Sequence, residues 1–197
     1  GDVTVDAEGR RLSEAEVIGR GGFATVYAAT NDLLGTRVAV KVLAPLTDES
    51  DRRRFERECR VMGRVSTHPS VVTVHHAGYS AEGRPYLVME LMEGGSLADR
   101  LRAAGPLGWA EAVDHGIAVA EALAHAHAEG ILHRDVKPEN ILVAADRPRL
   151  TDFGIAYLRD STGATSASIS ASWLHAPPET FANQPDERSD LYSLGSN

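Results

Sequence analysis

The fold is decided by the stretch His133-Arg134-Asp135-Val136-Lys137-Pro138-Glu139-Asn140. Pro138 excludes a regular helix and favours an extended Lys137, so we predict a loop that presents polar groups. In this loop Asp135 could accept the proton of an attacking hydroxyl, and Lys137 could neutralise a phosphate in transfer. Asn140 could ligate Mg²⁺. These side-chain types indicate phosphate chemistry.

A second carboxylate follows at a short distance along the chain. Ile141-Leu142-Val143 is predicted to be a strand, and Asp152-Phe153-Gly154 comes one short hairpin later. Mg²⁺ prefers oxygen ligands and is commonly held by one or two carboxylates plus phosphates. Asp152 is therefore a candidate metal ligand, although a solitary Asp-Phe-Gly is also typical of a plain turn.

Towards the other end of the chain lies a glycine-rich segment, Gly19-Arg20-Gly21-Gly22-Phe23-Ala24-Thr25-Val26. Glycines allow backbone N–H groups to close over an anionic phosphate without obstruction from a Cβ. The dinucleotide-binding motif requires a helix immediately afterwards, whereas a strand is predicted here. This favours a glycine-rich flap in a hairpin, with candidate phosphate contacts at Gly19, Gly21 and Gly22. An ordinary flexible turn is the alternative.

Lys41 lies on a predicted strand among the apolar residues Val38-Ala39-Val40. A lysine on a strand usually extends its ammonium to the surface, which is one interpretation. The other interpretation involves Glu58, which lies on the apolar face of a helix predicted at about 50–65, together with Phe55, Met62 and Val65. Leaving one member of a buried ion pair alone costs roughly 3–5 kcal/mol, so Glu58 would need Lys41 as a partner. A solvated position for Glu58 stays open.

Two halves of different character are predicted. The first half is mostly strand-like, with strands at 26–29, 37–42, 71–74 and 86–89 and a hairpin at 31–35. The second half is helical, with a capping box at Ser96–Asp99, a short helix that Gly105 ends, and a long helix from Trp109 to Glu129. The long helix is predicted to use one apolar face, formed by Val113, Ile117, Ala120 and Ala124. A hinge near Met92–Gly95 would separate one domain at 1–92 from another at 93–197.

Composition excludes several classes of protein. A net charge of -8 argues against general binding of nucleic acid, which usually needs a basic surface. A single cysteine, Cys59, excludes an internal disulfide framework and suits a reducing compartment such as the cytoplasm. No run of eighteen apolar residues is present, so no membrane span is expected in this segment.

Taken together, the ordered motifs resemble the protein kinase family, and in particular the eukaryotic-like serine/threonine kinases of bacteria such as actinobacteria. Pro178–Glu179 and the segment Asp190–Gly195 extend the similarity to the last residues. The resemblance implies an α+β fold of two lobes, with an antiparallel β N-lobe and a mainly helical C-lobe. It also implies that the chain ends before the C-lobe is complete.

The resemblance gives a role to each candidate residue. Asp135 would be the catalytic aspartate and Lys137 the lysine that contacts phosphate, while Asn140 and Asp152 would hold Mg²⁺ and the pair Lys41–Glu58 would position ATP. The adenine would lie between Val26, Ala39 and Leu142, next to Met89, with Glu90 and Met92 offering backbone groups. Asp99 would either reach the ribose or cap its helix.

Further expectations follow from the same resemblance. Lys137, two residues after Asp135, favours protein substrates with serine or threonine hydroxyls. Arg134 suggests regulation by phosphorylation at Thr162, Thr165, Ser166, Ser168 or Ser170, for which a homodimer phosphorylating in trans is expected; incidental composition is the alternative. The rival functions are a truncated, inactive kinase-like binding module and a small-molecule phosphotransferase. The central hypothesis is that Lys41, Asp135, Asn140 and Asp152 converge around one metal-bound triphosphate.

Overall fold

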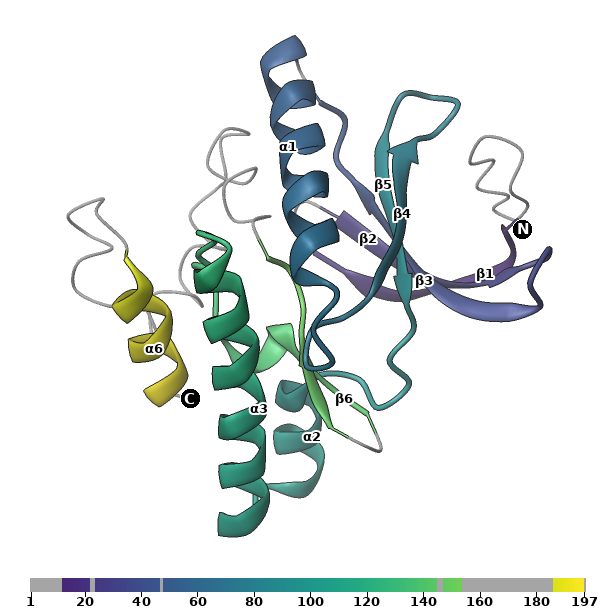
Figure 1. The fold of residues 1–197 in the computed structure, drawn as a ribbon. Helices are drawn as coiled ribbons and strands as arrows, with labels where there is room; N and C mark the ends of the chain where they lie inside the picture. Colours follow the sequence, from purple (N-terminus) through teal and green to yellow (C-terminus); the bar gives the residue numbers. More distant parts are fainter. Residues whose placement is uncertain (1–11, 22–23, 47, 145–146, 154–185, 197) are drawn as a thin grey trace. The chain divides into compact units, whose positions relative to one another are not determined.

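The computed structural model describes residues 12–21, 24–46, 48–144, 147–153 and 186–196 (Figure 1). Two compact units are present. Unit 1 contains Gly1–Cys59 and Thr73–Leu91, and unit 2 contains Arg60–Val72 and Met92–Asn197. No helix in the described ranges combines the length and the apolar character that a membrane crossing requires.

Unit 1 is built on a five-stranded antiparallel sheet in the order β1-β2-β3-β5-β4. The strands are β1 (Leu12–Arg20), β2 (Ala24–Asn31), β3 (Thr36–Leu43), β4 (Val74–Tyr79) and β5 (Pro85–Glu90). Alternate residues of a strand point to opposite faces of the sheet. One face forms a core from Leu12, Ala29, Val38, Val40, Val42, Tyr86 and Val88. The residues that alternate with these core residues along the strands therefore lie on the other face of the sheet.

Tight turns join these strands at the predicted places. Between β2 and β3, the backbone N–H of Gly35 donates to the Asn31 carbonyl at 2.8 Å, and Gly35 has φ +63°. The glycine-rich segment joins β1 to β2, with Gly19 opposite Val26 and the N–H of Gly21 donating to the Ala24 carbonyl at 2.9 Å. The prediction of a glycine-rich hairpin, rather than a strand-to-helix motif, is confirmed.

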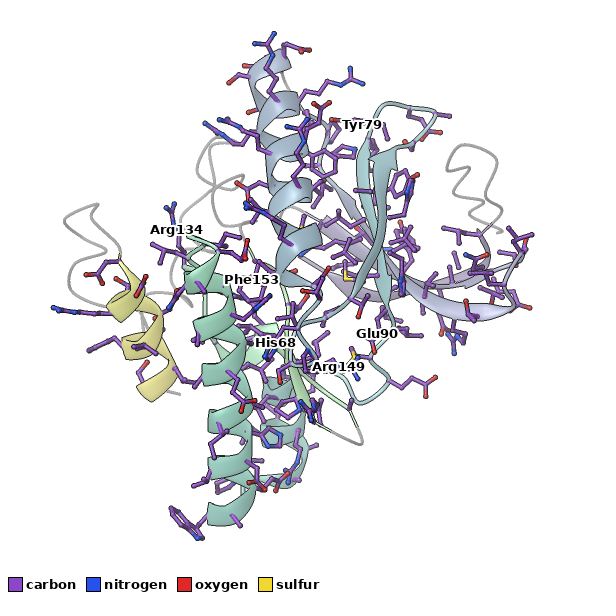
Figure 2. All side chains as sticks on the ribbon, in the orientation of Figure 1. His68, Tyr79, Glu90, Arg134, Arg149 and Phe153 are labelled. Atoms are coloured by element: carbon purple, nitrogen blue, oxygen red, sulfur yellow. The ribbon has the colours of Figure 1, made fainter. Side chains whose placement is uncertain are left out.

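The helix predicted at about 50–65 is α1 (Glu49–Val65). It begins with a side-chain cap, because the Asp48 carboxylate accepts the N–H of Asp51 at 2.9 Å. Its Phe55 meets the ring of Tyr79 on β4 edge to face at 5.5 Å, and the Arg52 guanidinium lies 4.4 Å from the same ring centre (Figure 2). Tyr79 thus fixes the first half of α1 on β4.

The predicted strand at 71–74 is wrong in its position. Only Val74 belongs to β4, which continues to Tyr79. Val71 and Val72 are buried and pair with Leu150 of β7 (Pro148–Leu150), with N–H to O distances of 3.0 Å for Val72 to Leu150 and 2.8 Å for Leu150 to Ser70. A short apolar run shows that a strand-like segment is present, but not which strand it pairs with.

Unit 2 contains the remaining elements. These are α2 (Leu97–Ala104), α3 (Trp109–Ala128), the 3₁₀ turn η1 (Pro138–Asn140), β6 (Ile141–Val143), β7 and α6 (Glu187–Gly195). The predicted capping box is confirmed: the Ser96 hydroxyl accepts the N–H of Asp99 at 3.1 Å, and the Asp99 carboxylate accepts the N–H of Ser96 at 3.1 Å. Gly105 ends α2 as predicted.

The apolar face predicted for α3 is wrong. Val113 and Ile117 are 38% and 53% exposed, and Ala124 is also exposed. The buried residues are Ala118, Val119, Ala122, Leu123 and Ala126. An alanine-rich helix has more than one apolar stripe, so its spacing alone does not select the stripe that packs. In the structure α3 packs against β7 and α6, and its buried stripe contains Val119 and Leu123.

Candidate active site

The loop at 131–140 is held between α3 and β6 by its apolar residues. Ile131 and Val136 are buried, and Pro138 begins the turn η1. The N–H of Asn140 donates to the Lys137 carbonyl at 2.9 Å and closes this turn. The sequence-based prediction of a non-helical, polar loop is therefore confirmed, apart from this single 3₁₀ turn.

Asp135 is held by two neighbours from the same loop. The Lys137 ammonium lies 2.9 and 2.8 Å from its two carboxylate oxygens. The Asn140 Nδ2 donates to the Asp135 carbonyl at 2.7 Å and to its Oδ2 at 3.1 Å. The side chains of Asp135 and Lys137 are 10% and 13% exposed, so this charge pair lies largely out of water. The structure brings these three predicted site residues together.

The backbone of the loop is anchored by Asp190 of α6. Its carboxylate accepts the N–H of His133 at 2.8 Å and the N–H of Arg134 at 2.7 Å, and it lies 2.8 Å from Nε2 of His127 on α3. Arg134 has a positive φ of 66°, which is rare for a residue other than glycine. Asp190, which is 1% exposed, thus holds the loop in a strained conformation.

Asp190 is firmly anchored in the structure. The helix α6 is short, but the partners of Asp190 lie on other elements, namely α3 and the loop. His127 and Asp190 were not among the predicted site residues. Asp190 begins a segment that carries the family resemblance, but nothing along the chain links it to His133 and His127, which lie 57 and 63 positions away.

His133 connects the loop to the segment that carries Asp152. Its Nδ1 accepts the N–H of Asp135 at 3.2 Å, and its Nε2 donates to the Thr151 carbonyl at 2.8 Å. These partners require a neutral ring with the proton on Nε2. Complete burial lowers the pKa of His133, and this effect exceeds the opposing effect of Asp190. Phe153 packs edge to face on the same ring at 4.6 Å (Figure 2).

The two predicted metal ligands lie on neighbouring backbone segments. The N–H of Thr151 donates to the Asn140 carbonyl at 2.9 Å, and Asp152 follows directly with a φ of +69°. Because Nδ2 of Asn140 binds Asp135, its Oδ1 is the atom left to ligate a cation. No group of three or more His, Cys, Asp or Glu side chains in the described segments is placed to hold a metal. The donor set is instead one carboxylate and one amide, which fits Mg²⁺ that also binds phosphates and water.

In unit 1, strand register groups the candidate nucleotide contacts on one face of the sheet. Residues directly opposite each other in an antiparallel pair share a face. Lys41 is opposite Val26 and Leu87, and Ala39 is opposite Met89. Lys41 is 8% exposed, so it is not a lysine whose ammonium reaches the surface. One face of the sheet carries the core with Val38, Val40 and Val42. The opposite face thus carries Val26, Ala39, Lys41 and Met89.

The helix α1 packs on this same face. Leu87 is opposite both Lys41 and Ala77, and Tyr79 lies two residues beyond Ala77, so Tyr79 shares the face of Lys41. Tyr79 in turn contacts α1, which carries the half-buried Glu58. This arrangement supports the predicted pair Lys41–Glu58, which stays a prediction.

The hinge segment contributes contacts in both units. In unit 1 the N–H of Glu90 donates to the Thr73 carbonyl at 2.9 Å. In unit 2 Met92 is buried, the N–H of Val143 donates to the Gly95 carbonyl at 2.9 Å, and Ser96 forms a bridge with Leu142. The two halves of the candidate site belong to different units, so the convergence of Lys41 with Asp135, Asn140 and Asp152 stays a prediction.

Several predicted residues lie outside the described ranges. These are Gly22, Gly154, Pro178, Glu179 and the hydroxyls Thr162, Thr165, Ser166, Ser168 and Ser170.

Comparison with known proteins decides the family. A family model described as the protein kinase domain matches residues 12–196. The chain belongs to the protein kinase family. The kinase domain structure of PknI from Mycobacterium tuberculosis is similar, with 31% identity, a TM-score of 0.72, and coverage of 95% of this chain and 72% of that one. The predicted two-lobed kinase fold class is confirmed.

The related kinases named below are bacterial, as the resemblance to bacterial serine/threonine kinases predicts. The chain is 45% identical over 187 residues to serine/threonine-protein kinase PknK of Mycobacterium tuberculosis, covering 94% of this chain and 17% of that protein. It is 44% identical to PknJ of Mycobacterium bovis, with coverage of 91% and 31%. It is 40% identical to the DNA damage-responsive serine/threonine-protein kinase RqkA of Deinococcus radiodurans, with coverage of 91% and 28%. The chain thus spans less than a third of the length of each of these relatives.

Proposed function

We propose that this kinase domain transfers the γ-phosphoryl group of ATP to serine or threonine hydroxyls of proteins. The observation that carries the proposal is the environment of Asp135, whose carboxylate is held by the Lys137 ammonium at 2.8 Å and by the Asn140 amide at 3.1 Å. The names of the relatives, which are serine/threonine-protein kinases, agree with this choice of substrate. A cytoplasmic location is part of the proposal and rests on the need for ATP and on the single cysteine.

In this mechanism Asp135 accepts the hydrogen bond of the substrate hydroxyl and orients its oxygen towards the phosphoryl group. Lys137 lies next to Asp135, where its ammonium can stabilise the negative charge of the phosphoryl oxygens in transfer. Asp190 and His133 hold the loop backbone so that Asp135 keeps its position. Positioning of this kind can supply a large part of a rate enhancement.

Asn140 and Asp152 would hold Mg²⁺ through an amide oxygen and a carboxylate. When bound, the ion would neutralise charge on the β- and γ-phosphates. The contribution of the chain is to keep the two ligands on adjacent segments, through the hydrogen bond from the N–H of Thr151 to the Asn140 carbonyl.

The glycine-rich hairpin supports the nucleotide half of the proposal. Neither Gly19 nor Gly21 has a positive φ, and a Cβ on either would meet only ordinary contacts, at 3.7 Å from Val26 for Gly19 and 3.8 Å from the Ala24 carbonyl oxygen for Gly21. The packing of the chain itself therefore does not require these glycines. Close approach of a phosphate, with Gly22 completing the loop, would require them.

The remaining candidates complete the proposed ATP site. Lys41, fixed by Glu58, would contact the α- and β-phosphates. The adenine would contact the side chains of Val26, Ala39, Met89 and Leu142 and the backbone at Glu90 and Met92.

The test is transfer of ³²P from [γ-³²P]ATP to a generic protein substrate such as myelin basic protein, with Mg²⁺ present. The proposal expects incorporation by the wild-type chain, a loss of at least a hundredfold in Asp135→Asn, and little change in the matched control Asp114→Asn, an exposed carboxylate on α3. Equal incorporation by wild type and Asp135→Asn would refute the role of Asp135. Binding of ATP without transfer would favour a non-catalytic binding module, and phosphorylation of small alcohols alone would favour a small-molecule phosphotransferase.

Self-phosphorylation provides a further readout for the proposed dimer. If two copies phosphorylate each other in trans, the wild-type chain should incorporate phosphate into an added, separately tagged Asp135→Asn chain. Absence of phosphate from the added Asp135→Asn chain would exclude this part of the proposal.

A further inference from the structure

Two histidines stack between a connecting segment and α3. His68 belongs to the connection between α1 and β4, and His125 lies near the end of α3. Their ring centres are 5.2 Å apart and the planes are inclined by 28° (Figure 2). Neither residue belongs to the motifs that define the proposed kinase site, so their contact calls for a separate explanation.

Hydrogen bonding fixes the protonation state of His68. Its Nδ1 accepts the backbone N–H of Ser70 at 3.1 Å. An imidazole nitrogen can accept a hydrogen bond only when it carries no proton. The contact with Ser70 therefore requires a neutral His68 ring, with its proton on Nε2. The Nε2 of His125 is buried and has no hydrogen-bond partner among the described residues.

The charged groups around the stack act in both directions. Burial is the largest effect and lowers the pKa of His68. The neighbouring His125 and Arg147 lower this pKa further, whereas Glu121 on α3 raises it. One turn after His125, Glu129 is paired with Arg64 of α1 at 3.5 Å. The balance of these effects favours the neutral ring.

The segment held by the stack leads to the proposed metal ligands. Directly after His68, the Ser70 carbonyl accepts the N–H of Leu150 at 2.8 Å, and the N–H of Val72 donates to the Leu150 carbonyl at 3.0 Å. Leu150 is followed by Thr151, whose N–H binds the Asn140 carbonyl at 2.9 Å. The connecting segment is therefore the edge against which β7 is placed, two residues before Asp152.

We propose that the stacked pair His68–His125 is an acid-sensitive latch, which holds the segment Ser66–Val72 and β7 against α3 when the His68 ring is neutral and releases them when His68 is protonated. In the neutral ring, Nδ1 of His68 accepts the N–H of Ser70. Once Nδ1 carries a proton, two N–H donors face each other and the hydrogen bond is lost. This change removes the attraction that keeps the segment in place.

The direction of the pH effect follows from linkage. A histidine whose pKa is lower in the folded state than in the unfolded state binds more protons when unfolded. Stability is therefore greatest above the unfolded pKa of about 6.5 and decreases as the pH falls through and below this value. The latch is closed at neutral pH and opens on acidification.

The experiment is hydrogen exchange followed by mass spectrometry at pH 7.5 and pH 5.5, corrected for the intrinsic exchange rates. The variant His68→Asn removes the titration of His68 but retains a side-chain acceptor for the N–H of Ser70. His75→Gln, at an exposed histidine of β4, is the matched control. In the wild type and the control, protection of the peptides that contain Ser70 and Leu150 is expected to fall about tenfold more on acidification than in His68→Asn.

A second measurement keeps the proposal falsifiable if a variant does not fold. The Cε1–H resonance of His68 in the wild type is followed by NMR as the pH is lowered, and a midpoint below 6.5 is expected. A midpoint at or above 6.5, or equal acid sensitivity of both peptides in wild type and His68→Asn, would overturn the latch. Neither readout depends on phosphoryl transfer, so failure of the latch and failure of the proposed kinase activity are distinguishable.

Discussion

Replacement of Asp190 by alanine tests whether α6 sets the geometry of the catalytic loop. The carboxylate accepts two backbone N–H groups, from His133 and Arg134, and contacts Nε2 of His127. After Asp190→Ala these donors lose their acceptor inside the protein. Arg134 also loses the contact that keeps it at φ +66°.

The size of the effect can be worked out from these contacts. A buried donor left unsatisfied costs about 1–3 kcal/mol, so the two backbone groups together cost about 2–6 kcal/mol. A loss of 1 kcal/mol lowers Tm by about 2–4 °C in a protein of 150–250 residues. At the midpoint of about 4 kcal/mol, Asp190→Ala should lower Tm by about 8–16 °C. Because Asp135 follows Arg134 directly, kcat should decrease at temperatures where the variant is still folded.

Differential scanning fluorimetry and initial rates of phosphoryl transfer at 20 °C provide the two readouts. Glu187→Ala is the matched control, because Glu187 lies exposed in the first turn of the same helix. His127→Phe removes one donor to Asp190 and should have a smaller effect, about 1 kcal/mol. A Tm within about 2 °C of wild type, together with an unchanged kcat in Asp190→Ala, would refute the anchoring role.

Four other substitutions or modifications have defined outcomes. A Cβ at Gly94 would lie 2.2 Å from the Val143 carbonyl oxygen, so Gly94→Ala should lower the free energy of unfolding by about 1–3 kcal/mol in urea titrations. A Cβ at Gly116 of α3 would meet nothing within 4 Å, so Gly116→Ala should raise the free energy of unfolding by up to about 1 kcal/mol. Burial, and to a lesser extent the nearby glutamates, raise the pKa of Cys59 from 9.0 to about 12. Alkylation of Cys59 by iodoacetamide at pH 8 should therefore be about a thousandfold slower than alkylation of a free thiol. A rate within tenfold of the rate of a free thiol would contradict this pKa. Ser96→Ala removes the cap of α2 and should cost about 1 kcal/mol, and an unchanged denaturation midpoint would show that the cap contributes nothing.

Local features of the fold could be predicted from the sequence because their causes are local. The capping box at Ser96–Asp99, the turn at Gly35 and the loop at Pro138 depend on residues within a few positions. The helix at 50–65 was predictable because Phe55, Met62 and Val65 form one apolar stripe, and all three are buried in the structure.

Features that depend on partners far along the chain could not be predicted. Val71 and Val72 have the composition of a strand, but they pair with Leu150 instead of extending β4. The buried face of α3 depends on what packs against it, and the apolar residues of that helix suit two faces. In the same way, motifs identify Asp135 and Lys137, whereas the anchoring roles of Asp190 and His127 require three-dimensional coordinates.

The pairing of Ser70–Val72 with Leu150 has a consequence for how the protein is synthesised. It closes a loop of about 80 residues, and closure of so long a loop carries a larger entropic cost than a hairpin does. On the ribosome, the strands of unit 1 up to Glu90 are complete before Leu150 is translated. The segment after α1 therefore lacks its pairing with Leu150 for several seconds during synthesis, and Val71 and Val72 lack this contact until Leu150 has left the ribosome. Chaperones that recognise short apolar segments would have this interval in which to act.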